Sequence, residues 1–224
     1  MSEWWTYGLR DLLLFSPQTY YRQFELHNAE WWPLPLITLA LGLVLPVLLH
    51  RGGPHSTRVV AVVLALCWLW VAWAFHWQRY AAINPAGGYF ALAFAVETLL
   101  LIWLGARQTQ PPKPVSKPNR HAGIAVFLYA LMFHPLVAPF QGRGWSQAEV
   151  FGMAPDPTAL ATLGILLMAR ERHFLVLALI PLLWCFVSGA TLWAMSAPNY
   201  FIAPLVALIA VVFATTSKLP AFSP

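Results

Sequence analysis

Long apolar runs separated by short polar links dominate the chain. A helix needs about 20 mostly apolar residues to cross the hydrocarbon core of a bilayer, with a range of about 17 to 25. Six runs meet or approach that length, and a seventh is apolar but shorter. In chain order the runs lie near 32–49, 58–76, 86–104, 122–140, 157–169, 174–195 and 200–217. The pattern predicts an all-α fold, a polytopic transmembrane helix bundle of about seven spans.

The segment before the first run, residues 1–31, is too polar to cross the hydrocarbon core but is rich in aromatic residues. Ser16 is a suitable N-cap for a helix that begins at Pro17. Helical spacing then places four ring-bearing side chains on one face: Tyr20, Phe24, His27 and Trp31. We expect an interfacial amphipathic helix, either lying along the outer leaflet or packed over the outer mouth of the bundle.

The composition excludes an ordinary solvated surface. Hydrophobic residue types make up 59% of the 224 residues and charged types only 9%, against about 25% charged in a soluble domain. The 13 Lys and Arg exceed the 8 Asp and Glu, but the basic residues lie in short links rather than on one solvated face, so a nucleic-acid partner is not expected. The lipid bilayer is the expected environment.

The distribution of basic residues between alternate links predicts the orientation, because cytoplasmic loops are enriched in Lys and Arg. With seven spans, 9 basic residues fall on one side and 4 on the other. The first group is Arg51, Arg58, Arg107, Lys113, Lys117, Arg120, Arg170, Arg172 and Lys218, and the second is Arg10, Arg22, Arg79 and Arg143. We therefore expect a bacterial inner-membrane protein with its N-terminus outside and residues 218–224 as a cytoplasmic tail. The acidic residues outside the spans, Glu149 and Asp156 among them, fall mainly on the outer side.

Two ionisable residues lie deep within the predicted spans, where a charge is costly unless it faces the bundle interior or water. At about 1.5 Å of rise per residue, Glu97 lies roughly 16 Å below the outer end of its helix and His134 roughly 18 Å above the inner end of its own. Their depths differ by only about 4 Å, so the two could face each other. Small hydroxyls come out at similar depth on two other spans: Thr158, Thr162, Ser188 and Thr191. They are either interhelical hydrogen-bonding groups or, with the ionisable pair, the lining of an outward-facing polar pocket.

The short run at 157–169 would stop inside the membrane if its inner end is held by the arginines that follow it. Asp156 would then cap a buried helix start, with Pro157 at the first helical position. Such a helix start is positively polarised, as in transporters with discontinuous helices. The alternative is a tilted ordinary helix preceded by the aperiodic stretch 142–155. In the preceding span, Pro135 is expected to kink the helix beside His134.

Four further polar residues are expected around the outer mouth: His27, His76, Arg79 and Asn84. His76 would lie about 9 Å further out than His134, which disfavours a haem held by both, because axial ligands on neighbouring helices need similar depth. A metal site using His134, Glu97 and either His27 or His76 stays geometrically open, although no compact ligand spacing supports it. No cofactor is predicted, and neither haem nor a metal is excluded.

Four short stretches carry a resemblance. They are the His-Asn and Trp-Pro of His27, Asn28, Trp32 and Pro33, the Tyr-x-x-Ile-Asn-Pro-Ala of Tyr80 to Ala86, the Phe-Gly-x-x-x-x-Pro-Thr of Phe151 to Thr158, and the Ile-Pro-Leu-Leu-Trp of Ile180 to Trp184. In these the chain resembles an uncharacterised bacterial family of multi-pass membrane proteins, a domain of unknown function. It departs from the family pattern at Asp156, where the pattern has Cys. The resemblance implies a membrane protein and no known activity.

The sequence favours a non-enzymatic protein, because it contains no GxSxG, GxxxxGK, HExxH or CxxC motif, although a membrane enzyme acting on lipid or quinone stays open. The leading hypothesis is a protein that binds or transports a small polar or ionic solute through the outward-facing pocket. The alternative is a non-catalytic membrane subunit of a redox or metal-handling complex, with the outer aromatic helix as its contact surface. Either a membrane-complex partner or a homo-oligomer is compatible with the sequence.

Overall fold

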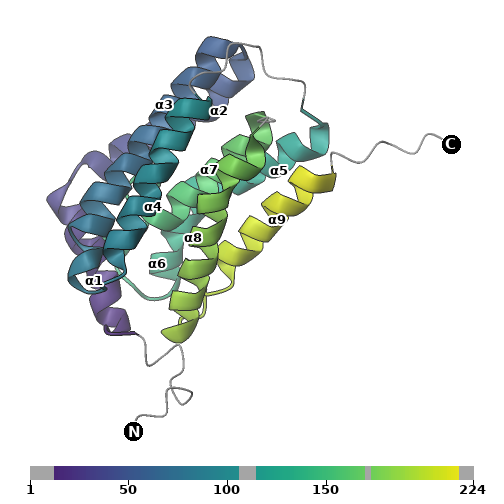
Figure 1. Ribbon diagram of the computed structural model, residues 1–224. Helices are drawn as coiled ribbons and strands as arrows, with labels where there is room; N and C mark the ends of the chain where they lie inside the picture. The colour runs from purple at the N-terminus through teal and green to yellow at the C-terminus, as the bar shows by residue number, and fades with distance from the viewer. Residues whose placement is uncertain (1–12, 106–114, 170–172, 217–224) are drawn as a thin grey trace, which may run out of the picture.

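A computed structural model describes residues 13–105, 115–169 and 173–216, and within these ranges the regular structure is entirely helical. The α-helices are α1 (Pro17–Glu30), α2 (Leu34–Arg51), α3 (Pro54–Trp70), α4 (Gly87–Leu100), α5 (Lys117–Leu128), α6 (Val137–Phe140), α7 (Pro155–Ala169), α8 (Phe174–Ala194) and α9 (Ile202–Thr216), shown in Figure 1. Short π- or 3-10 turns add η2 (Val71–Trp77), η3 (Tyr80–Ala82), η4 (Leu101–Gly105), η5 (Tyr129–Phe133), η6 (His134–Leu136) and η7 (Trp145–Gln147). The prediction of an all-α fold is confirmed within the described residues.

Each of the seven predicted apolar runs corresponds to a helix. Within the part of the chain that the structure describes, four helical stretches are long and apolar enough to cross a membrane: Leu34–Arg51, Pro54–Ala82, Lys117–Phe140 and Phe174–Ala194. Three apolar helices are shorter: Gly87–Trp103, Pro155–Ala169 and Ile202–Thr216. The predicted tail at 218–224 and six of the basic residues used for orientation lie outside the described residues: Arg10, Arg107, Lys113, Arg170, Arg172 and Lys218.

Large apolar side chains cover the outside of the bundle, as expected for a surface that faces lipid. On α2, Leu36 and Ile37 are more than half exposed, and on α8 the same holds for Leu183 and Phe186. Such a surface is unfavourable in water, because each exposed apolar side chain forgoes about 1.5–3 kcal/mol of burial. Lipid tails remove that cost, so the surface supports a membrane protein.

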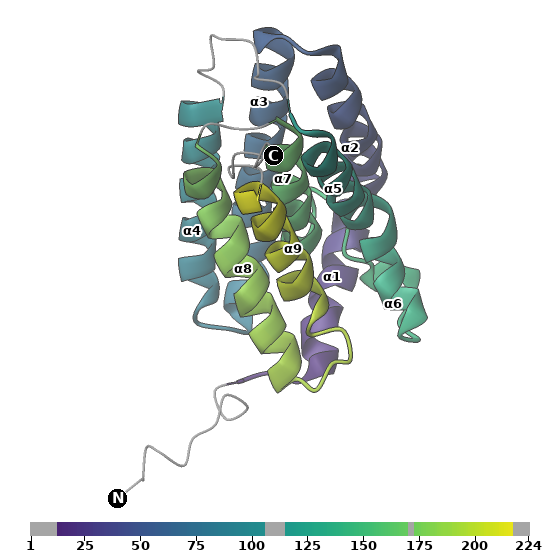
Figure 2. The ribbon, with the colours of Figure 1, turned by 90° about the vertical axis from the view of Figure 1, so that its right-hand side faces the viewer.

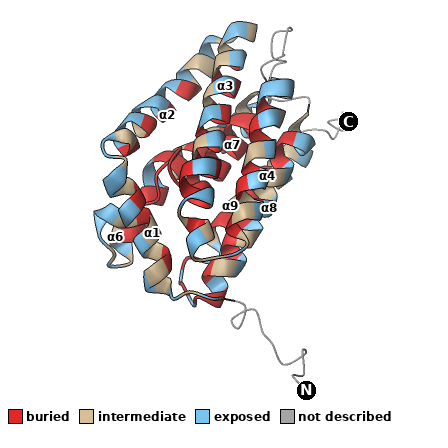
Figure 3. Cartoon of the chain, turned by 60° about the vertical axis from the view of Figure 1, so that its left-hand side comes forward, coloured by how far each residue is buried: buried red, intermediate tan, exposed pale blue. Residues whose placement is uncertain are grey.

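The centre of the bundle is α7. It packs against α2, α3, α5, α8 and α9, and Figure 2 shows it enclosed by its neighbours. Every residue from Pro155 to Leu167 is buried, which gives the red central helix of Figure 3. A mainly apolar helix without a distinct polar face suits this position, because none of its faces meets solvent or lipid.

The helix that contains His134 is interrupted, as predicted. The α5 helix runs into the π-turn η5, then into the 3-10 turn η6 that holds His134 and Pro135, and resumes as α6. Proline has no N–H to donate to the preceding turn, which accounts for the interruption. The change of geometry directs His134, which is 4% exposed, into the bundle.

The α1 helix packs against the protein itself. The Thr19 backbone N–H donates to Ser16 Oγ (3.1 Å), so the predicted cap is confirmed. The predicted aromatic face is buried at Tyr20, Phe24 and His27, with Phe24 stacked on Phe75 of η2 (ring centroids 4.8 Å apart). Of the two arrangements expected from sequence, the structure has the helix packed over one end of the bundle. Figure 1 shows α1 at the end opposite the turn between α2 and α3.

Candidate functional site

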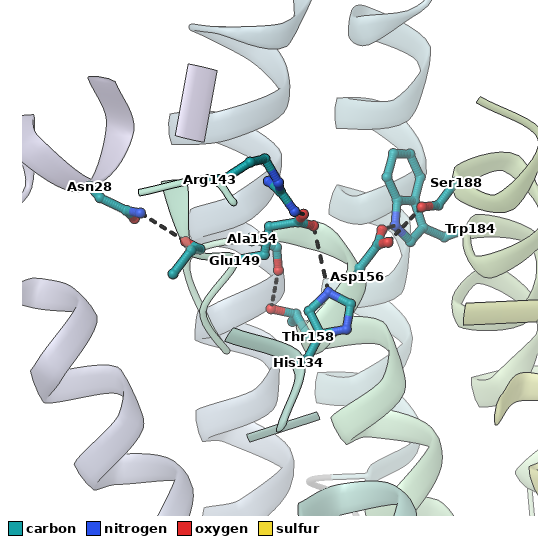
Figure 4. A network of polar contacts seen from close by, with 10 residues as sticks. Asn28, His134, Arg143, Glu149, Ala154, Asp156, Thr158, Trp184 and Ser188 are labelled. Carbon is teal, nitrogen blue, oxygen red and sulfur yellow. Dashed lines mark hydrogen bonds and ion pairs between the residues drawn. The ribbon is translucent and has the colours of Figure 1, made fainter. Parts of the chain in front are cut away.

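Three ionisable side chains from separate segments meet inside the bundle. They are His134 of η6, Glu149 of the loop before α7, and Asp156 in the first turn of α7, and all three are buried. One ligand atom from each lies within 4.8 Å of the other two. His134 Nε2 is 3.6 Å from Glu149 Oε2. Figure 4 shows the three side chains converging from different directions. Together, one imidazole and two carboxylates can bind a proton or a cation.

Asp156 is held in place by α8. Its Oδ1 accepts a hydrogen bond from Trp184 Nε1 (2.7 Å) and its Oδ2 accepts one from Ser188 Oγ (2.6 Å). The two donors are four residues apart and therefore lie on the same face of α8. Hydrogen bonds to a charged acceptor contribute about 1.5–3 kcal/mol each. Both carboxylate oxygens are thus fixed, and each keeps a lone pair available.

Glu149 is held by a loop that α1 fastens. Arg143 Nη2 lies 3.9 Å from Glu149 Oε1, and the same guanidinium lies 3.8 Å above the ring of Tyr21 on α1. Asn28 of α1 donates to the backbone carbonyls of Ser146 and Ala148 (2.9 and 2.8 Å). These contacts fix the backbone next to Glu149, so α1 helps to position one of the three ionisable groups.

The threonines of α7 shape the loop rather than line a pocket. Thr158 Oγ1 accepts from the Gly152 N–H (2.9 Å) and donates to the Ala154 carbonyl (2.7 Å). Gly152 has φ of +74°, and an added Cβ would lie 3.2 Å from Cys67 Sγ, so glycine is required there. Thr162 donates to the Thr158 carbonyl and accepts from Trp68 Nε1 (2.8 Å). Both hydroxyls act as interhelical or local hydrogen-bonding groups.

The predicted role of Asp156 as an N-cap is wrong. The α7 helix begins at Pro155, two residues before Pro157, so Asp156 lies within the first turn. Its carboxylate accepts from α8 instead of from its own backbone, because Trp184 and Ser188 reach it. The helix start is nevertheless buried, and the positive end of the helix dipole favours a carboxylate there.

Glu97 does not join the group around His134. It lies on α4, which packs on α3, η2 and α8, and its carboxylate oxygens are buried without a hydrogen-bond partner among the described residues. Thr191, also expected at the pocket, donates to the Val187 carbonyl of its own helix (2.9 Å). Of the seven predicted pocket residues, the structure brings together His134, Asp156 and Ser188.

The four residues predicted at the outer mouth lie in or beside α1, η2 and η3. Arg79 pairs with Glu30 and also donates to the Leu26 carbonyl (3.3 Å), so it ties α1 to the bundle. Asn84 donates to Tyr80 OH (3.1 Å) and accepts from the Ala86 N–H, which closes a turn. His76 is fully buried among aromatic rings, with its ring centroid 4.4 Å from that of Phe94 and 4.8 Å from that of Trp184.

The pKa of His27 provides a test of how α1 packs against the rest of the bundle. Its ring packs on Phe75, and burial, assisted by the charge of Arg79, lowers its pKa from 6.5 to about 4. A histidine with a lowered folded-state pKa contributes stability above pH 6.5 that is lost as pH falls toward 4. We expect wild type to lose about 2 kcal/mol of unfolding free energy between pH 7.5 and pH 5 through this group. Thermal unfolding in detergent at the two pH values measures the loss.

The matched variant is His27→Gln, in which that part of the pH dependence should disappear, while His55→Gln, at an exposed position, should keep it. An unchanged pH profile in His27→Gln would show that α1 docking does not depend on a neutral histidine.

Sequence reasoning missed Glu149, Arg143 and Trp184. The pattern of polar links predicts Glu149 in an outer link and predicts no site role for Arg143 or Trp184. One signal was present: Glu149 is the only charged residue between Ala148 and Ala154. A single acid in an otherwise apolar stretch indicates a buried loop, whereas a solvated link would carry several polar residues.

Comparison with known proteins agrees with the sequence resemblance. Residues 17–221 match a family of unknown function, DUF6064. The chain belongs to this family. The matched range contains His134, Glu149 and Asp156, so the whole site lies within the DUF6064 domain. No curated protein and no solved structure matches the chain.

Proposed function

We propose that this DUF6064 protein is a multi-pass membrane protein that binds a small cation at His134, Glu149 and Asp156 and exchanges it with the outer side. The observation that carries the proposal is the meeting of two carboxylates and an imidazole within 4.8 Å inside an apolar bundle. Ionisable groups at such depth usually mark an ion or solute pathway. The proposal keeps the solute class expected from sequence, a small polar or ionic solute. It replaces Glu97 with Glu149 as the acidic partner of His134 in the binding site.

Ion binding is tested by the thermal stability of the detergent-purified protein in a panel of inorganic cations and anions. A cation at 100 times its Kd should stabilise the protein by about 2.7 kcal/mol. We expect cations to raise the melting temperature of wild type and to lose this effect in Glu149→Gln and Asp156→Asn. Glu97→Gln is the matched control, since it neutralises a buried carboxylate outside the site. Loss of the effect only in Glu97→Gln would move the binding site to α4.

The membrane arrangement in this proposal has about seven spans, with α1 outside and the C-terminus in the cytoplasm of a bacterial cell. It is supported by seven apolar helices and by the excess of basic residues on alternate links. It places the loop before α7 outside and the turn between α2 and α3 inside.

Cysteine labelling tests that arrangement, because the native Cys67 and Cys185 are buried. A membrane-impermeant maleimide applied to intact spheroplasts should label Ser146→Cys but not His55→Cys. Permeabilised cells should show both labelled, which controls for reactivity. Labelling of His55→Cys alone in intact spheroplasts would establish the opposite orientation.

A further inference from the structure

The cluster has the chemistry of a transition-metal site rather than of an alkali-metal site. Building on the cation binding proposed above, we infer that His134 Nε2, Glu149 and Asp156 bind a divalent transition-metal ion of the Mn²⁺, Fe²⁺, Co²⁺ or Zn²⁺ group. The inference specifies the solute class for the same three residues. It concerns a resident or transported ion, and it requires no redox step.

The spacing fits first-row metal coordination. At metal–nitrogen and metal–oxygen bond lengths of about 2.1 Å, tetrahedral ligand atoms lie about 3.4 Å apart. His134 Nε2 and Glu149 Oε2 are 3.6 Å apart. The widest separation in the trio, at most 4.8 Å, has to shorten by about 1.4 Å to reach the tetrahedral value. Because Trp184 and Ser188 hold Asp156, the His134 and Glu149 side chains have to rotate toward it to cover that distance.

The donor types narrow the choice of metal. An imidazole nitrogen suits Zn²⁺, Fe²⁺ and related ions, whereas Ca²⁺ and Mg²⁺ are bound by oxygen ligands. Thiolates, which select Cu⁺, are not part of the group, because the donors that meet there among the described residues are one histidine and two carboxylates. A mixed nitrogen and oxygen set therefore favours the Mn²⁺ to Zn²⁺ range.

The surroundings of the ligands resemble the outer shell of a metal site. Metal-binding carboxylates are usually oriented by further hydrogen bonds, and loss of such a partner typically costs 10- to 100-fold in metal affinity. Trp184 and Ser188 supply these bonds to Asp156, and Arg143 lies beside the Glu149 oxygen that faces away from His134. The two carboxylate ligands are thus held in place, Asp156 by α8 and Glu149 by the loop that α1 fastens.

The burial of the His134 imidazole and its lack of hydrogen-bond partners within the described part of the chain are a second observation that supports a metal site. His134 is 4% exposed, and its Nδ1 has no hydrogen-bond partner among the described residues. Its Nε2 faces Glu149 beyond hydrogen-bond distance. A metal ion between Nε2 and the Glu149 carboxylate would give this buried ring nitrogen a close partner, which the 3.6 Å separation in the structure does not. Three protein ligands leave a coordination position open, as at sites where an ion exchanges or binds water.

The test uses full-length protein in detergent, purified through an affinity tag that contains no histidine and stripped with chelator. Co²⁺ is titrated in and the visible d–d absorption is recorded, followed by displacement with Zn²⁺ and by elemental analysis. We expect one Co²⁺ per chain in wild type, with affinity at least 10-fold weaker in His134→Ala, Glu149→Gln and Asp156→Asn. Glu97→Gln, and a double variant His50→Gln with His55→Gln that removes two exposed imidazoles, should bind as wild type does.

A ligand variant that fails to fold would be detected by circular dichroism and gel filtration. Trp184→Phe then serves in its place, since it keeps all three ligands and should still weaken Co²⁺ binding about 10-fold. Equal Co²⁺ binding by wild type and all the folded site variants would overturn the inference. A protein that binds no transition metal but is stabilised by Na⁺ or another cation through Glu149 and Asp156 would overturn the metal assignment and leave the proposed function intact. If no cation stabilises the protein, both fail.

Discussion

Gly164→Ala is expected to lower the free energy of unfolding by about 3 kcal/mol, at the upper end of the cost of overpacking a core. An added Cβ at Gly164 would lie 2.8 Å from the Gly123 carbonyl oxygen and 2.8 Å from the Phe127 backbone nitrogen. Both atoms belong to the backbone of α5, so no side chain can rotate away to make room. The helices α5 and α7 would have to separate along their contact.

The measurement is SDS-induced or thermal unfolding of wild type and variant in the same detergent. Gly88→Ala is the matched control, because an added Cβ there would meet only Trp77, at an ordinary contact distance of 3.8 Å. We expect the control to unfold at the wild-type midpoint or slightly above it, since alanine favours helix over glycine. Equal midpoints for Gly164→Ala and wild type would show that α5 and α7 do not need this close approach.

The glycine contact also determines the geometry of the site. In membranes, small residues let helices approach closely, and association then depends on packing rather than on a hydrophobic driving force. Gly123 and Gly164 meet on α5 and α7, and the same two helical segments lead to His134 and Asp156. Displacing one helix from the other would therefore move the imidazole away from the carboxylate. Folded Gly164→Ala should bind Co²⁺ more weakly although no ligand has changed.

The helices could be predicted from sequence because each depends on a local signal. Apolar runs of sufficient length determine where the helices lie, and Ser16 with Pro17 marks the start of α1 as predicted. Pro135 likewise interrupts its helix for a reason contained in one residue. The apolar composition does not distinguish a full span from a shorter buried helix, because α7 is mainly apolar without a distinct polar face and is enclosed by protein.

The partners in the site could not be predicted, because depth along a helix does not give direction around it. Glu97 and His134 come out at similar depth, yet α4 packs on α3, where the neighbouring Thr98 donates to the Ala65 carbonyl (3.4 Å). Glu149 lies in a stretch without helical periodicity, so the sequence pattern does not predict which way its side chain points. The loop enters the bundle through contacts between distant segments, such as Asn28 to Ala148, and these contacts have no local signature.

A double-mutant cycle across Asp156 and Trp184 is expected to show strong coupling. Asp156→Leu removes the acceptor of two buried donors, Trp184 Nε1 and Ser188 Oγ. Leaving such groups unsatisfied costs about 1–3 kcal/mol each, so the single variant should lose roughly 2–6 kcal/mol of unfolding free energy in metal-free buffer. Trp184→Phe leaves the carboxylate with one donor fewer and should lose about 1.5–3 kcal/mol.

Because both single variants break the same hydrogen bond, the double variant should lose less than the sum of the two by about 1–2 kcal/mol. SDS-induced unfolding followed by circular dichroism measures all four proteins. Trp77→Phe, which alters an exposed tryptophan, should combine additively with Asp156→Leu. Additive losses for Asp156 and Trp184 would mean that their hydrogen bond contributes no stability, and α8 would then not hold the carboxylate in position. Strong coupling would instead make α8 the element through which any ion at Asp156 affects the rest of the bundle, because Trp184 also contacts the rings of Phe90 and Phe94 on α4.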